Sequence, residues 1–75
     1  IDVVRLVRGA DVALLLKEQV DGTFKGSLRS RNNFNVQELS AIFDGGGHKA
    51  ASGFSSTSSE QDIIKIIKNE IRTKL

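Results

Sequence analysis

Three consecutive glycines stand immediately before the only histidine of the chain, in Gly45-Gly46-Gly47-His48. One glycine is enough to end a helix, so the extra two indicate a backbone that must approach another group closely. Glycine-rich turns expose consecutive backbone N–H groups, and such groups bind anions. A phosphate dianion also favours the protonated form of a neighbouring imidazole. The segment therefore predicts an anion-binding turn, and the plain alternative is a flexible turn with a surface histidine.

Two arginines, Arg29 and Arg31, lie two positions apart in residues 23–31, whose alternation predicts a strand. Side chains at this spacing share one face and lie about 7 Å apart, so both guanidinium groups are expected to project from the same side. A guanidinium holds phosphate through paired N–H donors, which an ammonium group does not match in geometry. The two arginines are thus candidate phosphate ligands, and the alternative is a solvated strand face.

The first third of the chain predicts a hairpin. Residues 11–19 predict a strand, and its unbroken apolar run over residues 12–16 is typical of a strand covered on both faces. Asp21-Gly22 predicts the turn into the strand at residues 23–31, because glycine tolerates a positive φ. Residues 1–9 fit either a short helix or an edge strand.

Two helices and a third strand follow. Asn35 is a good cap for a helix over residues 36–43, which Asp44 and the glycines end. Residues 50–55 predict a strand with small side chains. Residues 60–74 form the clearest amphipathic helix, with a cap from residues 57–59 and an apolar stripe that consists of Ile63, Ile67 and Ile71.

These elements predict an α/β (mixed α+β) fold: a single small domain with a mixed sheet of three or more strands packed by two or three helices, in two or three layers. If the strands at residues 23–31 and 50–55 share a sheet, the intervening helix predicts a parallel pair with a right-handed crossover. That arrangement would put the arginines and the glycine turn at opposite ends of the sheet. A shared pocket then requires a bent strand or an antiparallel placement, and the sequence leaves both open.

Composition excludes several classes of protein. With 75 residues the chain forms one domain, and a net charge of +2 is too small for a broad nucleic-acid-binding surface. It has no cysteine, and one histidine cannot build a multi-histidine metal site alone. No apolar run approaches the roughly 20 residues that span a bilayer, so no membrane contact is expected. Because the chain begins with Ile1 and contains no methionine, we expect it to be an excised part of a larger protein.

Three segments together resemble a known family: residues 27–31 (SLRSR), residues 35–36 (NV) and residues 45–54 (GGGHKAASGF). They are similar to the DHH-associated C-terminal domain of the DHH phosphoesterases. Within that family the resemblance is to bifunctional oligoribonuclease and phosphoadenosine phosphate phosphatase proteins, a branch that also holds cyclic dinucleotide phosphodiesterases and exopolyphosphatase-related proteins. The resemblance extends over residues 11–54, and the last helix fits it too. Asp44 departs from it, because many relatives carry another glycine there.

The resemblance implies that residues 1–75 form the substrate-binding domain of a manganese-dependent phosphodiesterase. Arg29 and His48 would contact the phosphates of a nucleotide or short oligonucleotide, and Gly45, Gly46 and Gly47 would shape the pocket. Ser30 and Arg31 complete the predicted site. The catalytic residues and two manganese ions would belong to the N-terminal DHH domain, with no metal or cofactor in this one.

The remaining expectations are a cytoplasmic location and, since sheet edges can pair, a homodimer. Two alternative functions stay open. One is a nucleic-acid-binding module without a hydrolase role, like the domain that ends alanyl-tRNA synthetases. The other is a structural or dimerisation domain whose glycine turn serves packing alone.

Overall fold

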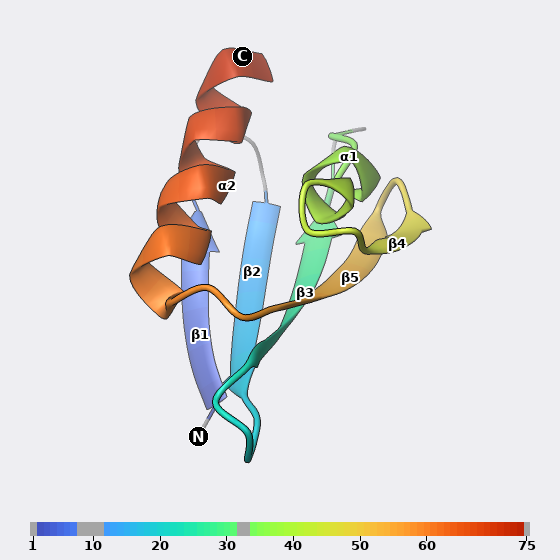
Figure 1. Ribbon diagram of the computed structural model, residues 1–75. Coiled ribbons are helices and arrows are strands. Elements are labelled where there is room, and N and C mark those ends of the chain that lie inside the picture. The colour runs from blue at the N-terminus through green and yellow to red at the C-terminus, as the bar shows by residue number, and fades with distance from the viewer. Residues whose placement is uncertain (1, 8–11, 32–33, 75) are drawn as a thin grey trace.

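The computed structural model describes residues 2–7, 12–31 and 34–74, and the side chains of residues 12–31 and 34–73. Five strands and two helices follow one another along the chain (Figure 1). In order they are β1 (Asp2–Val7), β2 (Val12–Glu18), β3 (Phe24–Ser30), α1 (Gln37–Ala41), β4 (Gly46–His48), β5 (Ala51–Ser56) and α2 (Glu60–Lys74). The predicted α+β class and the single sheet with two helices are confirmed.

All four strand pairings are antiparallel, in the order β1-β2-β3-β5-β4. The expected parallel pair between residues 23–31 and 50–55 is therefore wrong, and the sheet is not mixed. The reason is β4, whose residues the sequence predicts as a turn. It reverses the chain once more after α1, so that β5 pairs with β3 in the antiparallel direction and not in the parallel one. In addition, α1 has only five residues, about 7.5 Å of helix, so it is too short to carry the chain back along the length of β3.

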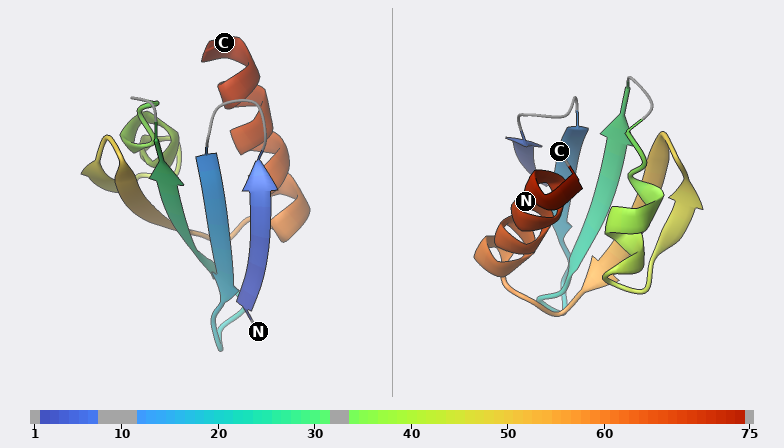
Figure 2. Two further views of the ribbon diagram at one scale, coloured as in Figure 1. Left: turned by 180° about the vertical axis from the view of Figure 1, so that it is seen from behind. Right: turned by 90° about the horizontal axis from the view of Figure 1, so that it is seen from above.

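Both helices lie on the same face of the sheet, which gives two layers (Figure 2). The core between the layers is closed by side chains from β2, β3, β5 and the helices; they are Val12, Leu14, Leu16, Leu28, Val36, Leu39, Phe54, Ile63, Ile67 and Ile71. The apolar run in β2 is not covered on both faces as expected. Its residues alternate, and Leu15, which points away from the helices, is 40% exposed. The other face of the sheet therefore stays uncovered by the helices.

The ends of the elements follow local signals in part. Residues 2–7 form a strand, so the helical alternative for the N-terminus is wrong. The N–H of Asp62 donates to Ser59 Oγ at 3.1 Å, which confirms the cap at the start of α2. Asn35 Oδ1 accepts the N–H of Gln37 at 3.0 Å, but the residue at the N-cap position of α1 is Val36. No helix among the described residues is long and apolar enough to cross a membrane.

The hairpin between β2 and β3 turns at Gly22, whose φ of 88° favours glycine. Thr23 fixes the turn, since both its hydroxyl and its N–H donate to the Asp21 carboxylate. These bonds stabilise the ionised form and lower the pKa of Asp21, which is fully exposed. Their contribution to stability is present at neutral pH and is lost as the pH falls through that lowered pKa.

The end of α1 has the hydrogen bonds of a Schellman motif. Gly45 N–H donates to the Ser40 carbonyl at 2.9 Å, and Asp44 N–H donates to the Ala41 carbonyl at 3.0 Å. In this motif the C′ residue adopts the left-handed conformation, and Asp44 holds it with a φ of 60°. Glycine adopts this conformation without the steric cost that a Cβ brings. An aspartate thus stands at the position that ends α1 where glycine would fit best.

We expect Asp44→Gly to raise the free energy of unfolding by about 0.5–1 kcal/mol, because it removes the Cβ from a left-handed residue. Urea denaturation followed by circular dichroism measures the shift. Asp62→Gly, which places glycine inside α2, is the control and should be destabilising. A loss of stability in Asp44→Gly would contradict this account of the turn.

Candidate functional site

The strand register places Arg29 and His48 in one row across the sheet. Arg29 of β3 is opposite Ala51 of β5, and Ala51 is opposite His48 of β4. Directly opposed residues of antiparallel strands project to the same face, so all three side chains belong to the face that the helices leave uncovered. Two strand spacings separate Arg29 from His48, about 10 Å between backbones. The antiparallel alternative thus holds, and it brings the two sequence-predicted groups to the same end of the sheet.

The surface between and beside them carries little side-chain bulk. Ala51 alone separates Arg29 from His48, and it is half-buried. The next row consists of Ser27, Gly53 and Gly46. The result is a shallow surface of small residues, with an exposed guanidinium on one side and an exposed imidazole on the other. A small anion can reach the backbone here without meeting a large side chain.

The three glycines serve different purposes. A Cβ on Gly45 would lie 2.2 Å from the Gly53 carbonyl oxygen, so Gly45 allows the chain to pass close to β5. Gly47 has a φ of 141°, and a Cβ there would meet the backbone of β5 at 2.7 Å. Packing explains both. A Cβ on Gly46 meets nothing within 4 Å, so packing does not explain Gly46.

The predicted anion-binding turn is instead the edge strand β4, with its ladder to β5. The N–H of Gly45 is already donated to the Ser40 carbonyl. Gly46 and Gly47 therefore form a strand and not the expected turn, and the N–H of Gly45 is not available to an anion. What they provide is a thin strand that lies close to β5 and carries His48 at its end.

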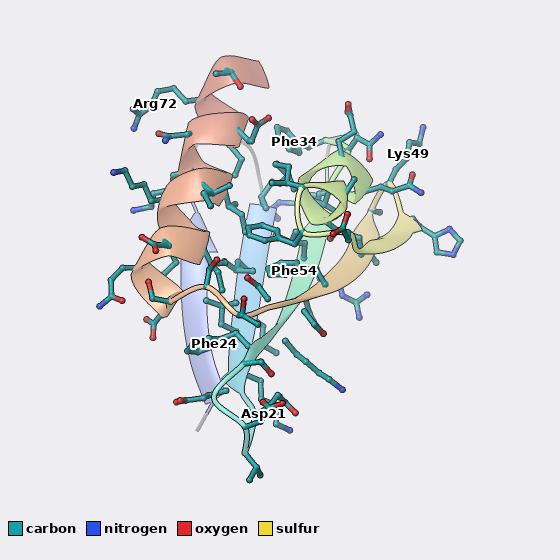
Figure 3. The ribbon with its side chains drawn as sticks, in the orientation of Figure 1. Asp21, Phe24, Phe34, Lys49, Phe54 and Arg72 are labelled. Atoms are coloured by element: carbon teal, nitrogen blue, oxygen red, sulfur yellow. The ribbon has the colours of Figure 1, made fainter. Side chains whose placement is uncertain are left out.

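Two backbone hydrogen bonds hold the turn that follows His48. The Lys49 carbonyl accepts the N–H of Val36 at 2.8 Å, and the Ala50 carbonyl accepts the N–H of Ser30 at 3.0 Å. The turn is thereby fixed to both ends of the connection between β3 and α1. The Lys49 side chain is exposed and extends outward from the turn (Figure 3).

The remaining predicted site residues differ from Arg29 in placement. Ser30 projects to the opposite face of β3, where its hydroxyl donates to the Phe34 carbonyl at 2.5 Å and lies 3.3 Å from the Lys49 carbonyl. Arg31 is exposed but lies beyond the end of β3, so the two arginines do not share one strand as expected. Of Arg29, Ser30 and Arg31, Arg29 is the one that lies in strand register on the uncovered face.

A hydrogen-bonded pair of serines, the buried Ser40 and the half-buried Ser52, joins α1 to β5 and was not predicted from the sequence. Ser52 Oγ donates to the Val36 carbonyl at 2.9 Å and lies 2.6 Å from Ser40 Oγ. Since the Ser52 proton is used for Val36, Ser40 must donate to Ser52. The only sequence signal was small polar residues at helix and strand positions that face inward. This link holds β5, and with it the row that contains Ala51, beneath α1.

A hollow of about 700 Å³ lies beside the row of Ser27 and Gly53. Its lining combines β3, β5 and the connection from α1 to β4, and consists of Lys25, Gly26, Ser27, Phe43, Asp44, Gly45, Gly53, Phe54 and Ser55. It does not include Arg29 or His48. The hollow and the row are nevertheless adjacent, because Gly53 is two residues along β5 from Ala51.

The described side chains of β2 to β5 bring basic groups to the uncovered face. Among the described side chains of β2 to β5, those in register on this face include Lys17, Lys25, Arg29 and His48 and no acidic residue. The described residues also bring no three histidine, aspartate or glutamate side chains together as metal ligands. This face has the groups to bind an anion but no ligand set for a metal.

Comparison with known proteins assigns the family. The model of the DHHA1 domain matches residues 2–73, so the chain belongs to the DHHA1 domain family. A solved structure similar to this chain is that of an exopolyphosphatase-related protein from Bacteroides fragilis, at 30% sequence identity with a TM-score of 0.73. The similarity covers 83% of this chain but only 18% of that protein, so the chain corresponds to a small part of it.

We expect Gly45→Ala to destabilise the domain by several kcal/mol, because its Cβ would collide with backbone that cannot move aside. Gly46→Ala is the matched control and should change stability by less than about 1 kcal/mol, since its Cβ meets open space. Thermal unfolding of both variants measures the difference. Equal losses of stability would refute the separate roles of these glycines.

Proposed function

We propose that this domain binds the phosphate groups of a nucleotide or short oligonucleotide for a DHH-family phosphoesterase. The observation that carries the proposal is the row in which Ala51 alone separates Arg29 from His48 on the uncovered face. Membership of the DHHA1 family and the similarity to an exopolyphosphatase-related protein support a role in phosphate ester hydrolysis.

The chemistry of the row suits a terminal phosphate. The Arg29 guanidinium offers paired N–H donors to two phosphate oxygens, which a lysine would not match. The His48 imidazole, carried on the edge strand β4, approaches from the other side and offers an N–H donor to the same phosphate. Gly46 leaves the adjoining backbone uncovered, which lets the anion come close.

Hydrolysis itself is assigned to another part of the protein. The two-metal mechanism requires carboxylate and imidazole ligands to hold the ions, and the described residues of this chain contain no such set. The two manganese ions would belong to the N-terminal DHH domain. By holding one phosphate, this domain would fix the position of the next phosphodiester relative to those metals. Such an arrangement favours short substrates and stepwise cleavage from one end.

Ser30 and Arg31 have supporting roles in this proposal. The Ser30 hydroxyl is directed at two backbone carbonyls, so it positions the turn after His48 and does not contact substrate. Arg31, exposed beyond the end of β3, adds positive charge near the bound phosphate. Arg29 and His48 remain the two groups that make direct contact.

We expect Arg29→Ala and His48→Ala each to weaken binding of adenosine 5′-monophosphate by about tenfold or more, since each removes a charged contact to phosphate. In the full-length enzyme, activity should fall by about 10²-fold or more. Isothermal titration calorimetry and turnover measure the two effects. Arg72→Ala is the matched control, because Arg72 is exposed on the outer side of α2 (Figure 3). Unchanged binding in both site variants would refute the proposal.

A nucleic-acid-binding role without hydrolysis is the second candidate, and the cations of β2 and β3 on the uncovered face favour it. Under that reading, Lys17→Ala would weaken binding of a long single-stranded RNA as much as Arg29→Ala does, and the affinity would fall steeply with salt. Under the phosphate-binding proposal, Lys17→Ala has little effect on either ligand. Filter binding of a 20-nucleotide RNA at two salt concentrations distinguishes the two.

A further inference from the structure

The hollow beside the phosphate-binding row has the position that a nucleobase would need. It begins at Ser27 and Gly53, one row from Arg29 and Ala51, and reaches Lys25 and Ser55 in the next row. Successive rows on one face repeat about every 7 Å. A nucleotide whose phosphate lies in the first row therefore extends its sugar and base along the strands into the hollow.

Asp44 is the only acidic residue in the lining of this hollow. The backbone of Asp44 makes the turn that ends α1, but its side chain does not contribute to that turn. The exposed carboxylate has no hydrogen bond or ion pair among the described residues. The φ of Asp44, 60°, is one at which glycine would be more stable. An unfavourable residue at a ligand-sized hollow points to a functional role.

A carboxylate in this place does not suit a second phosphate, because like charges repel. It accepts hydrogen bonds, so it suits the part of a nucleotide that donates them. Guanine alone among the common bases presents two adjacent N–H donors, at N1 and N2, that one carboxylate can accept together. Adenine and cytosine present one exocyclic amino group beside a ring nitrogen that repels the carboxylate.

The rest of the lining complements the same base. Lys25, from β3, offers an ammonium donor, and lysine is a frequent partner of guanine O6 and N7. Phe43 is half-buried and forms an aromatic wall, stacked on Phe54 with ring centroids 4.4 Å apart. Gly45 and Gly53 add backbone without side chains, which leaves room for a flat ring.

We propose that this hollow is a guanine subsite, in which Asp44 accepts hydrogen bonds from N1 and N2 of the base and Lys25 donates to O6. The inference rests on the proposed phosphate-binding function and specifies its substrate class: nucleotides or short oligonucleotides with guanine at the bound end. Asp44 is the residue that determines this preference.

The test compares four ligands by isothermal titration calorimetry on the 75-residue chain: guanosine, inosine and adenosine 5′-monophosphates, and ribose 5-phosphate. We expect guanosine monophosphate to bind about tenfold more tightly than adenosine monophosphate, because a bidentate hydrogen bond from the base to Asp44 contributes a factor of about this size. Inosine monophosphate, which lacks the N2 amino group, should bind with an affinity between those of the other two nucleotides. Asp44→Asn, which tolerates the same backbone conformation, should remove the preference and leave ribose 5-phosphate binding unchanged. Asp62→Asn on α2 is the control and should keep the preference.

Each other outcome has a definite meaning. If ribose 5-phosphate binds through Arg29 and His48 but guanine and adenine nucleotides bind equally, the guanine subsite is refuted and the phosphate-binding function stands. The same holds if Asp44→Asn keeps the preference for guanine. If no ligand binds, or if Arg29→Ala leaves the binding of all four ligands unchanged, the proposed function fails, and the guanine subsite fails with it.

Discussion

The β4–β5 hairpin is the element on which the rest of this structure depends. Its turn is held by two hydrogen bonds, from Val36 N–H to the Lys49 carbonyl and from Ser30 N–H to the Ala50 carbonyl. Because the hairpin reverses the chain after α1, β5 lies antiparallel to β3. That direction sets the register in which Arg29, Ala51 and His48 form one row. Without the hairpin, the arginine and the histidine would lie at opposite ends of the sheet.

The β4–β5 hairpin requires close approach of two backbone segments, and this requirement restricts which residues its sequence can contain. Gly45 passes so near Gly53 that no side chain fits, and Gly47 adopts a conformation that favours glycine. Glycines lose more conformational entropy on folding than other residues, so this segment lowers stability unless other contacts offset it. The part-buried hydrogen bonds of Ser40 and Ser52, together with the contacts of Leu39 and Phe54 in the core, provide that offset on the helix side.

One face of the sheet forms the core with the helices, and the other face carries the proposed binding row. Alternation along β2 and β3 sends Leu14, Leu16 and Leu28 to the helices, and sends Lys25 and Arg29 to the open face. A small domain can bury only about 60% of its unfolded surface, so one covered face must supply most of the core. The open face is then free to carry exposed cations beside a floor of glycine and alanine. Asp44 lies between the covered face and the open face of the sheet, in the segment that leads from α1 to β4 beside β5.

Local patterns in the sequence were sufficient for much of this fold. The periodicity of Ile63, Ile67 and Ile71 predicts α2, alternation predicts β3, and Asp21-Gly22 predicts the first hairpin, since each depends on neighbours within a few residues. The residue types of Arg29 and His48 also predict phosphate binding from the sequence, and that chemistry stays a prediction. The strand β4 could not be found in this way, because three residues containing two glycines show no strand pattern; only pairing with β5 makes them a strand. The row of Arg29 and His48, the hollow beside Asp44 and the hydrogen bond between Ser40 and Ser52 join residues distant in the chain, so tertiary structure alone decided them.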